Sequence, residues 1–247
     1  MGGELVRQEE VGEVVGRLSE GDLDGRERGR LLAQLIGLLG SGVRAAGARA
    51  ALTGRFLSDL VADVAPHVPV RDLVTLRQHH GGLSGDELAD ALVRQASRAT
   101  AGVGAAGGAL AAVQATAPPS FVLAPVQLAA ETVAVVATEL KLVAELHVVY
   151  GTAPVAPPAD VAAAYLHAWA TRSPVDLRTG PPDLGTVLGA AARQQLRRRV
   201  ARRLVRNTAT MAPFLTGALA GAELNRRETR ALGDELLVQL HPHRSGS

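Results

Sequence analysis

Apolar residues recur at the spacing of an α-helix through almost the whole 247-residue chain, without the alternating pattern of a strand. Aromatic residues make up only 2% of the chain, so Ala, Leu, Val and Gly must form the interior. Small side chains let helices approach closely, whereas a β-sandwich usually draws on aromatic and β-branched residues for its faces. The sequence therefore predicts an all-α protein.

The predicted helices follow one another with short connections. They cover residues 4–19, 23–41, 44–65, 70–80, 85–100, 101–116, 120–150, 158–172, 184–207 and 211–240. Gly151 is placed to end one helix and Pro158 to begin the next. We expect a single all-helical domain over 1–247, made of an N-terminal helical part, a helical core and a frayed tail. These three parts are 1–83, 84–240 and 241–247.

The longest uncharged stretch, 99–130, exceeds the roughly 20 residues that span a bilayer. Prolines at 118, 119 and 125 interrupt it, and charged residues follow directly in the next apolar helix. We therefore interpret 101–116 and 120–150 as a central Gly/Ala-rich apolar hairpin of a multi-helix bundle. Insertion of this hairpin into lipid is the alternative.

Cysteine is absent, which excludes disulfides, thiolate metal sites and cysteine nucleophiles. The N-terminus has no apolar stretch of the kind found in a secretory signal. The formal net charge is only +2, so the chain as a whole does not favour a polyanion, and nucleic acid is not an expected partner. We expect a cytoplasmic protein, with attachment to the inner face of the cytoplasmic membrane as a refinement of that expectation.

Two nucleotide-binding motifs are excluded. Gly102 to Gly107 spell a dinucleotide-binding fingerprint, but a helix precedes them where that motif needs a strand. Lys141, the only lysine, has no glycine before it and no Ser or Thr after it, so a Walker A loop is impossible. We expect no cofactor.

The glycines of two segments instead predict close helix packing. Gly104 and Gly108 lie on one small-residue face of the first segment. Gly217 and Gly221, followed by Asn225, form the second. We interpret all five as structural, with the asparagine side chain bonding a neighbouring backbone.

The 120–150 helix carries four charged residues in an otherwise apolar sequence: Glu131, Glu139, Lys141 and Glu145. At about 100° per residue, all of these but Glu139 share one sector. Lys141 and Glu145 have the spacing of an i,i+4 ion pair. A buried ionic cluster is the structural interpretation, and an enzyme site that includes a reactive Lys141 is the functional one.

Metal ligands are sparse. His79 and His80 are adjacent at a predicted helix end, but two neighbouring histidines do not make a metal centre. The His-Glu-x-x-His pattern of zinc hydrolases is absent. We expect no metal site and name no catalytic residue.

A basic helix over 193–206 is the most distinctive surface element. Its apolar stripe contains Leu196, Val200 and Leu204. The opposite side, here called the basic face, consists of Arg199, Arg202, Arg203 and Arg206. Such a face suits an anionic membrane surface or a membrane protein, although a solvated face paired with acidic residues is equally consistent with the pattern.

The residues after this helix resemble the end of EcsC-family proteins. A proline, a Gly-x-x-x-Gly-Ala helix, an asparagine and a threonine carry the resemblance, here Pro213, Gly217, Gly221, Asn225 and Thr229. Segments 101–108 and 145–151 are similar to the family's middle portion, so that 85–240 is covered. The family is helical, bacterial and without an established catalytic activity. The resemblance implies association with membranes or membrane proteins and carries over no catalytic residue.

Three functions follow as hypotheses. We favour a non-catalytic protein that docks on a membrane, or on transport or envelope components, through the basic face. The second is an enzyme whose site is the charged part of the 120–150 helix, which requires an adjoining cavity. The third is a self-associating structural module that uses its Ala/Gly faces to form a homo-oligomer.

Overall fold

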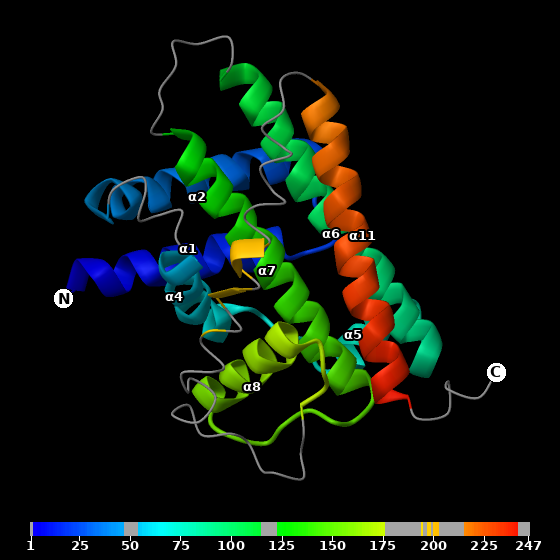
Figure 1. Cartoon of the computed structure of the whole chain (residues 1–247). Coiled ribbons are helices and arrows are strands. Elements are labelled where there is room, and N and C mark those ends of the chain that lie inside the picture. Colours follow the sequence, from blue (N-terminus) through cyan, green and yellow to red (C-terminus); the bar gives the residue numbers. More distant parts are fainter. Residues whose placement is uncertain are drawn as a thin grey trace.

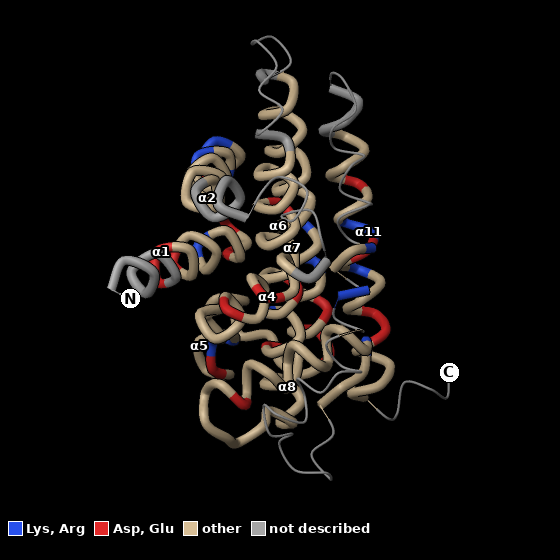
Figure 2. Tube along the Cα trace, turned by 60° about the vertical axis from the view of Figure 1, so that its left-hand side comes forward, with Lys and Arg blue, Asp and Glu red and all other residues tan. Residues whose placement is uncertain are grey.

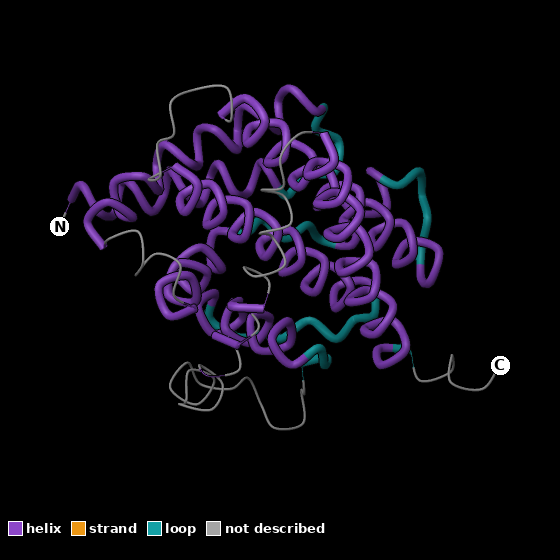
Figure 3. Tube along the Cα trace, turned by 45° about the horizontal axis from the view of Figure 1, so that its top comes forward, coloured by secondary structure: helices purple, strands orange, loops and turns teal. Residues whose placement is uncertain are grey.

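The computed structural model describes residues 2–46, 54–114, 123–175 and 215–241, together with 194, 197–198 and 200–202. Every regular element within these ranges is a helix (Figure 3), which confirms the predicted all-α bundle. The elements are α1 (Gly2–Leu18), α2 (Gly25–Ala46), α4 (Gly54–Val64), the 3-10 helix η1 (Ala65–His67), α5 (Leu73–His79), α6 (Gly85–Gln114), α7 (Leu123–Val149), α8 (Pro158–Thr171) and α11 (Leu215–Leu240).

Helix α7 is the centre of the bundle. All residues from 126 to 147 are buried, as expected for a helix that is apolar on every side. It contacts α1, α2 and α4 on one side and α6, α11 and α8 on the others (Figure 1). The surrounding helices therefore determine which side chains lie next to the charged residues of α7.

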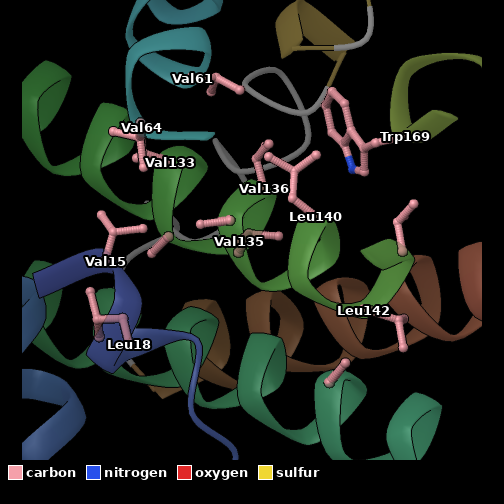
Figure 4. Packing of buried hydrophobic residues seen from close by; sticks show 14 of the residues in the cluster. Val15, Leu18, Val61, Val64, Val133, Val135, Val136, Leu140, Leu142 and Trp169 are labelled. Atoms are coloured by element: carbon pink, nitrogen blue, oxygen red, sulfur yellow. The ribbon is translucent and has the colours of Figure 1, made fainter. Parts of the chain in front are cut away.

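The core around α7 is mostly aliphatic. In Figure 4, Val133, Val136 and Leu140 of α7 lie among side chains from α1, α4 and α8. Trp169 on α8 is the only tryptophan and has no exposed surface. The burial of many small apolar side chains therefore takes the place of an aromatic core.

Helices α6 and α11 run side by side (Figures 1 and 2), and two small-residue segments meet between them. A Cβ added to Gly104 would lie 2.7 Å from the carbonyl carbon of Gly221 and 2.8 Å from Nδ2 of Asn225. That Nδ2 donates to the carbonyl oxygen of Thr100 at 3.2 Å. Gly108 lies on the same helix as Gly104 and is also buried. Gly217 belongs to α11, but its surroundings lie outside the described part of the structure.

Helix α6 differs from the prediction because it is one helix of 30 residues instead of two. The predicted ranges 85–100 and 101–116 form this one helix, and glycines just after residue 100 lie against side chains of other helices. Gly102 lies against Arg28, whose Nε is 2.6 Å from the position of an added Cβ, and Gly107 lies against the carboxylate of Glu131. Tertiary contacts therefore offset the weak helix propensity of these residues.

The helix ends near the site have clear local causes. Gly151 has a φ of +66° and ends α7 as predicted, with the amide of Thr152 donating to the carbonyl of His147 at 2.9 Å. Pro158 occupies the first turn of α8, also as predicted. Asp72 caps α5 by accepting from the amide of Thr75 at 2.8 Å.

None of the described helices is long and apolar enough to cross a membrane. The arms of the predicted hairpin are α6 and α7, and their connection at 115–122 lies outside the described residues. Both arms pack against other helices of the bundle.

Candidate ligand-binding cleft

The four charged residues of α7 do not form one cluster. Glu131 and Glu145 share a helix sector, but fourteen residues separate them, which corresponds to about 21 Å along the helix axis. Glu131 lies beside α6, where Gln127 Nε2 donates to its Oε1 at 2.8 Å and to the carbonyl of Gly107 at 2.7 Å. This end of α7 is a packing contact between α6 and α7.

Glu139 faces another direction, toward α8 and α11. Trp169 Nε1 donates to its Oε2 at 2.8 Å, and the hydroxyl of Thr229 donates to its Oε1 at 2.9 Å. The Thr229 hydroxyl also lies 2.9 Å from that of Thr100 on α6. These bonds join four helices through one buried carboxylate, which is a structural arrangement.

Lys141 and Glu145 form the predicted i,i+4 pair, with Nζ 3.3 Å from Oε1. Arg71, from the segment that precedes α5, binds the same carboxylate with two parallel hydrogen bonds. Its Nε donates to Oε1 at 2.7 Å and its Nη2 to Oε2 at 2.8 Å. The exposed fractions of the Arg71, Lys141 and Glu145 side chains are only 19%, 7% and 3%. Two cations therefore share one buried carboxylate.

The connector between η1 and α5 holds this arrangement in place. Lys141 Nζ donates to the carbonyl oxygen of Pro69 at 2.7 Å. Arg71 follows two residues later, directly before the residue that caps α5. Nη1 of Arg71 also lies 3.5 Å from Nδ1 of His79 at the end of α5. The connector is thus bound to α7 at two points, the Pro69 carbonyl and the Arg71 guanidinium.

An open cleft adjoins these cations, with a volume of about 540 Å³. This volume is within the range of small-molecule sites. Its lining residues are Glu20, Gly21, Asp22, Pro69, Arg71, Thr75, His79, His80, Gln95 and Lys141. We call it the Lys141 cleft. It brings together the α1–α2 turn, the η1–α5 connector, α5, α6 and α7.

The charges of the cleft influence one another. Burial lowers the pKa of the Lys141 amine below its ordinary value of 10.5, Glu145 opposes this effect and Arg71 adds to it. The pKa of Arg71 is raised, first by its hydrogen bonds to Glu145. Burial and the charge of Arg71 lower the pKa of His80. The amine and the imidazole are therefore closer to their neutral forms than exposed groups would be.

Nε2 of His80 and Oε1 of Gln95 are buried in the lining without a partner in good hydrogen-bond geometry, although the Gln95 side chain lies close enough to His80 to raise the pKa of its imidazole. Such atoms are uncommon because an unsatisfied buried group costs about 1–3 kcal/mol. The Gln95 side chain packs directly against Gly21, where a Cβ would overlap the Gln95 amide.

Only part of the cleft was visible from the sequence. Lys141 was singled out as the sole lysine, and His79 and His80 as a histidine pair. Arg71 and Gln95 carried no signal of their own, because each is distant along the chain from α7. The only sequence cue was the general rule that buried acids need partners such as arginine.

Metal-ligating side chains do not gather in three or more anywhere in the described ranges. His79 and His80 line the cleft, but Arg71, a cation, is the side chain that contacts His79. Neither the cleft nor the rest of the described chain therefore presents a ligand set for a metal ion.

The basic face lies mostly outside the described residues. Of its four members only Arg202 is described, and it is exposed, whereas Val200 of the predicted apolar stripe is fully buried. Arg199, Arg203 and Arg206 are not described.

In comparisons with protein-family models, curated proteins and solved structures, nothing matched this chain. The resemblance to the EcsC family therefore stays a prediction that rests on the residues that carry it.

Proposed function

We propose that this protein binds a small organic anion in the Lys141 cleft. The observation that carries the proposal is the pair of cations, Arg71 and Lys141, that share the single carboxylate of Glu145 at the edge of a cleft of about 540 Å³. One positive charge at this point has no counterion among these three groups. An anionic group of a ligand would supply it.

Both cations retain hydrogen-bond donors for such a ligand. A guanidinium has five N–H groups, and Arg71 uses two of them on Glu145. An ammonium has three, and Lys141 directs two toward Glu145 and the Pro69 carbonyl. Charge-assisted hydrogen bonds to a carboxylate or phosphate are about twice as strong as neutral ones. The remaining donors therefore favour an anion over a neutral ligand.

Calorimetric titration of the full chain with mono- and dicarboxylates and with inorganic phosphate tests the proposal. We expect saturable binding by at least one of these anions. The Lys141→Met variant should weaken it tenfold or more, whereas Lys141→Arg, which keeps the charge, should weaken it less. Arg230→Met is the matched control, because Arg230 is an exposed cation on α11 outside the cleft. Absence of binding by every probe, or equal binding by Lys141→Met, would overturn the proposal.

An enzyme role for Lys141 has some support from the same geometry, because a buried amine next to another cation in a cleft is a potential nucleophile. The proposal is restricted to binding, since the described residues identify no reaction. The titration distinguishes the two roles. A binding protein leaves the added anion chemically unchanged, whereas an enzyme converts it into a product.

We also propose, independently, that the basic face attaches the protein to an anionic membrane surface or a membrane protein. Its support is the orientation of the described part of the 193–206 segment, where Val200 is buried and both Arg198 and Arg202 are exposed. Because protein already covers the apolar side at Val200, the arginines would attract an anionic lipid surface through their charge. Self-association through the Ala/Gly faces is less supported, since Gly104 and Gly221 are already in contact within the chain.

A further inference from the structure

The lining of the Lys141 cleft contains acidic side chains as well as the two cations. Glu20 and Asp22, in the turn between α1 and α2, both line the cleft. Each is near enough to Arg71 to raise the pKa of its guanidinium, and Glu20 acts in the same way on Lys141. The lining therefore has two charged groups, the cations Arg71 and Lys141 (the cationic end) and the carboxylates of Glu20 and Asp22 (the acidic end), which influence each other without forming an ion pair.

The acidic end is available for binding. Asp22 is exposed, and no described cation lies within ion-pair distance of its carboxylate. Glu20 has only a long contact of 3.8 Å to Arg17, and the exposed fractions of these two side chains are 42% and 52%. Exposed contacts of this kind contribute little energy. Both carboxylates can therefore accept hydrogen bonds from a ligand.

The charge balance distinguishes between ligands. With neutral histidines, the lining carries two positive charges, on Arg71 and Lys141, and two negative charges, on Glu20 and Asp22, while Glu145 lies outside the lining and pairs with the two cations. A polyanion such as phosphate would be attracted at one end and repelled at the other. A molecule with one negative and one positive group would be attracted at both ends.

We propose that the ligand of the Lys141 cleft is a zwitterion of the α-amino-acid class. Its carboxylate binds the Arg71–Lys141 end, and its ammonium group binds Glu20 and Asp22. Oε1 of Gln95, which lies beside the His80 ring in the lining, is a third acceptor for the ammonium group. This inference rests on the proposed anion binding and adds the requirement for a second, positive group.

The experiment separates the two proposals by removing one ligand charge at a time. The full chain is first titrated with each of the standard L-amino acids. The one that binds most tightly is then compared with its analogue lacking the amino group and its analogue lacking the carboxylate. We expect both analogues to bind at least tenfold more weakly than the amino acid.

Two variants locate the effect. Asp22→Asn should weaken amino-acid binding tenfold or more and leave binding of the analogue without the amino group unchanged. Asp22 is exposed, so the substitution leaves the fold intact, and thermal unfolding of the variant checks this. Asp234→Asn on α11 is the control acid outside the cleft, and it should change neither affinity.

Each remaining outcome is decisive. If carboxylates without an amino group bind as tightly as any amino acid, the zwitterion inference is wrong and anion binding stands. The same holds if Asp22→Asn weakens both ligands equally. If no amino acid, no simple carboxylate and no phosphate binds, both proposals fail; if phosphate alone binds, anion binding stands and the zwitterion inference is wrong.

Discussion

Gly104 on α6 lies directly against the main chain of Gly221 on α11, so that a Cβ on Gly104 would be 2.7 Å from both the carbonyl carbon and the carbonyl oxygen of Gly221. Real Cβ atoms essentially never approach backbone this closely, and the backbone of a helix has little freedom to move away. The absence of a side chain at this position therefore determines how close α6 and α11 can be.

The Gly104→Ala substitution should consequently destabilise the protein by about 1–3 kcal/mol, because overpacking forces the two helices apart. Gly37→Ala on α2 is the matched control, since an added Cβ there would meet nothing within 4 Å. That variant should be more stable by about 0.5–1 kcal/mol, the usual gain of Ala over Gly inside a helix. Urea unfolding followed by the fluorescence of Trp169 measures both, and equal stabilities would contradict the close packing.

The sequence was sufficient to predict the elements that depend on local pattern. Helical spacing predicted the bundle, and the apolar surroundings of the charges on 120–150 predicted the central position of α7. The pair of Lys141 and Glu145 was predictable because both partners lie on one helix, four residues apart.

What the sequence could not predict depends on elements that are far apart along the chain. Arg71 precedes Glu145 by 74 residues, and nothing local marks it as the partner of that carboxylate. The helical-wheel argument grouped Glu131 with Glu145 because it measures angle and ignores the distance along the axis. The break expected near residue 100 was wrong because local propensity does not include the neighbours that cover Gly102 and Gly107.

The shared carboxylate makes a second prediction. Glu145→Gln should destabilise the protein by about 3 kcal/mol, because it leaves Arg71 and Lys141 together without their buried counterion. Asp234→Asn should have no measurable effect, since the pair of Arg230 and Asp234 is 3.8 Å apart and more than half exposed. Denaturant unfolding at pH 7 tests this comparison. If the two variants lose the same free energy of unfolding, Glu145 does not hold the cations as described.

His147 makes a prediction about pH. Nδ1 of its fully buried ring lies 2.7 Å from the Val143 carbonyl, and the amide of Val175 donates to Nε2 at 2.9 Å. An imidazole that donates from Nδ1 and accepts at Nε2 is neutral. Burial lowers the pKa of His147 below its ordinary value of 6.5. At mildly acidic pH, His147 therefore binds a proton more readily in the unfolded chain than in the folded one.

The free energy of unfolding should accordingly fall as the pH drops below about 6.5, the ordinary histidine pKa in the unfolded chain. His147→Gln should be less stable at pH 8, because it loses these two hydrogen bonds, but should show a shallower decline between pH 7 and pH 5. His80 contributes a decline of the same sign in both proteins. The difference between the two slopes therefore isolates His147, and identical slopes would show that its ring accepts a proton in the folded protein.

The basic face makes the last prediction. Its four arginines should hold the full chain on vesicles that contain an anionic phospholipid and not on neutral phosphatidylcholine vesicles, because each cation near an anionic surface contributes about 1 kcal/mol. Flotation should disappear in high salt, which screens these contacts. Replacing the four arginines of the basic face with serine should abolish flotation. Replacing four arginines elsewhere, Arg26, Arg30, Arg226 and Arg230, should preserve most of it and so excludes a simple effect of net charge. An absence of flotation at low salt would show that this face does not bind lipid, and the Lys141 cleft would then remain as the proposed binding site.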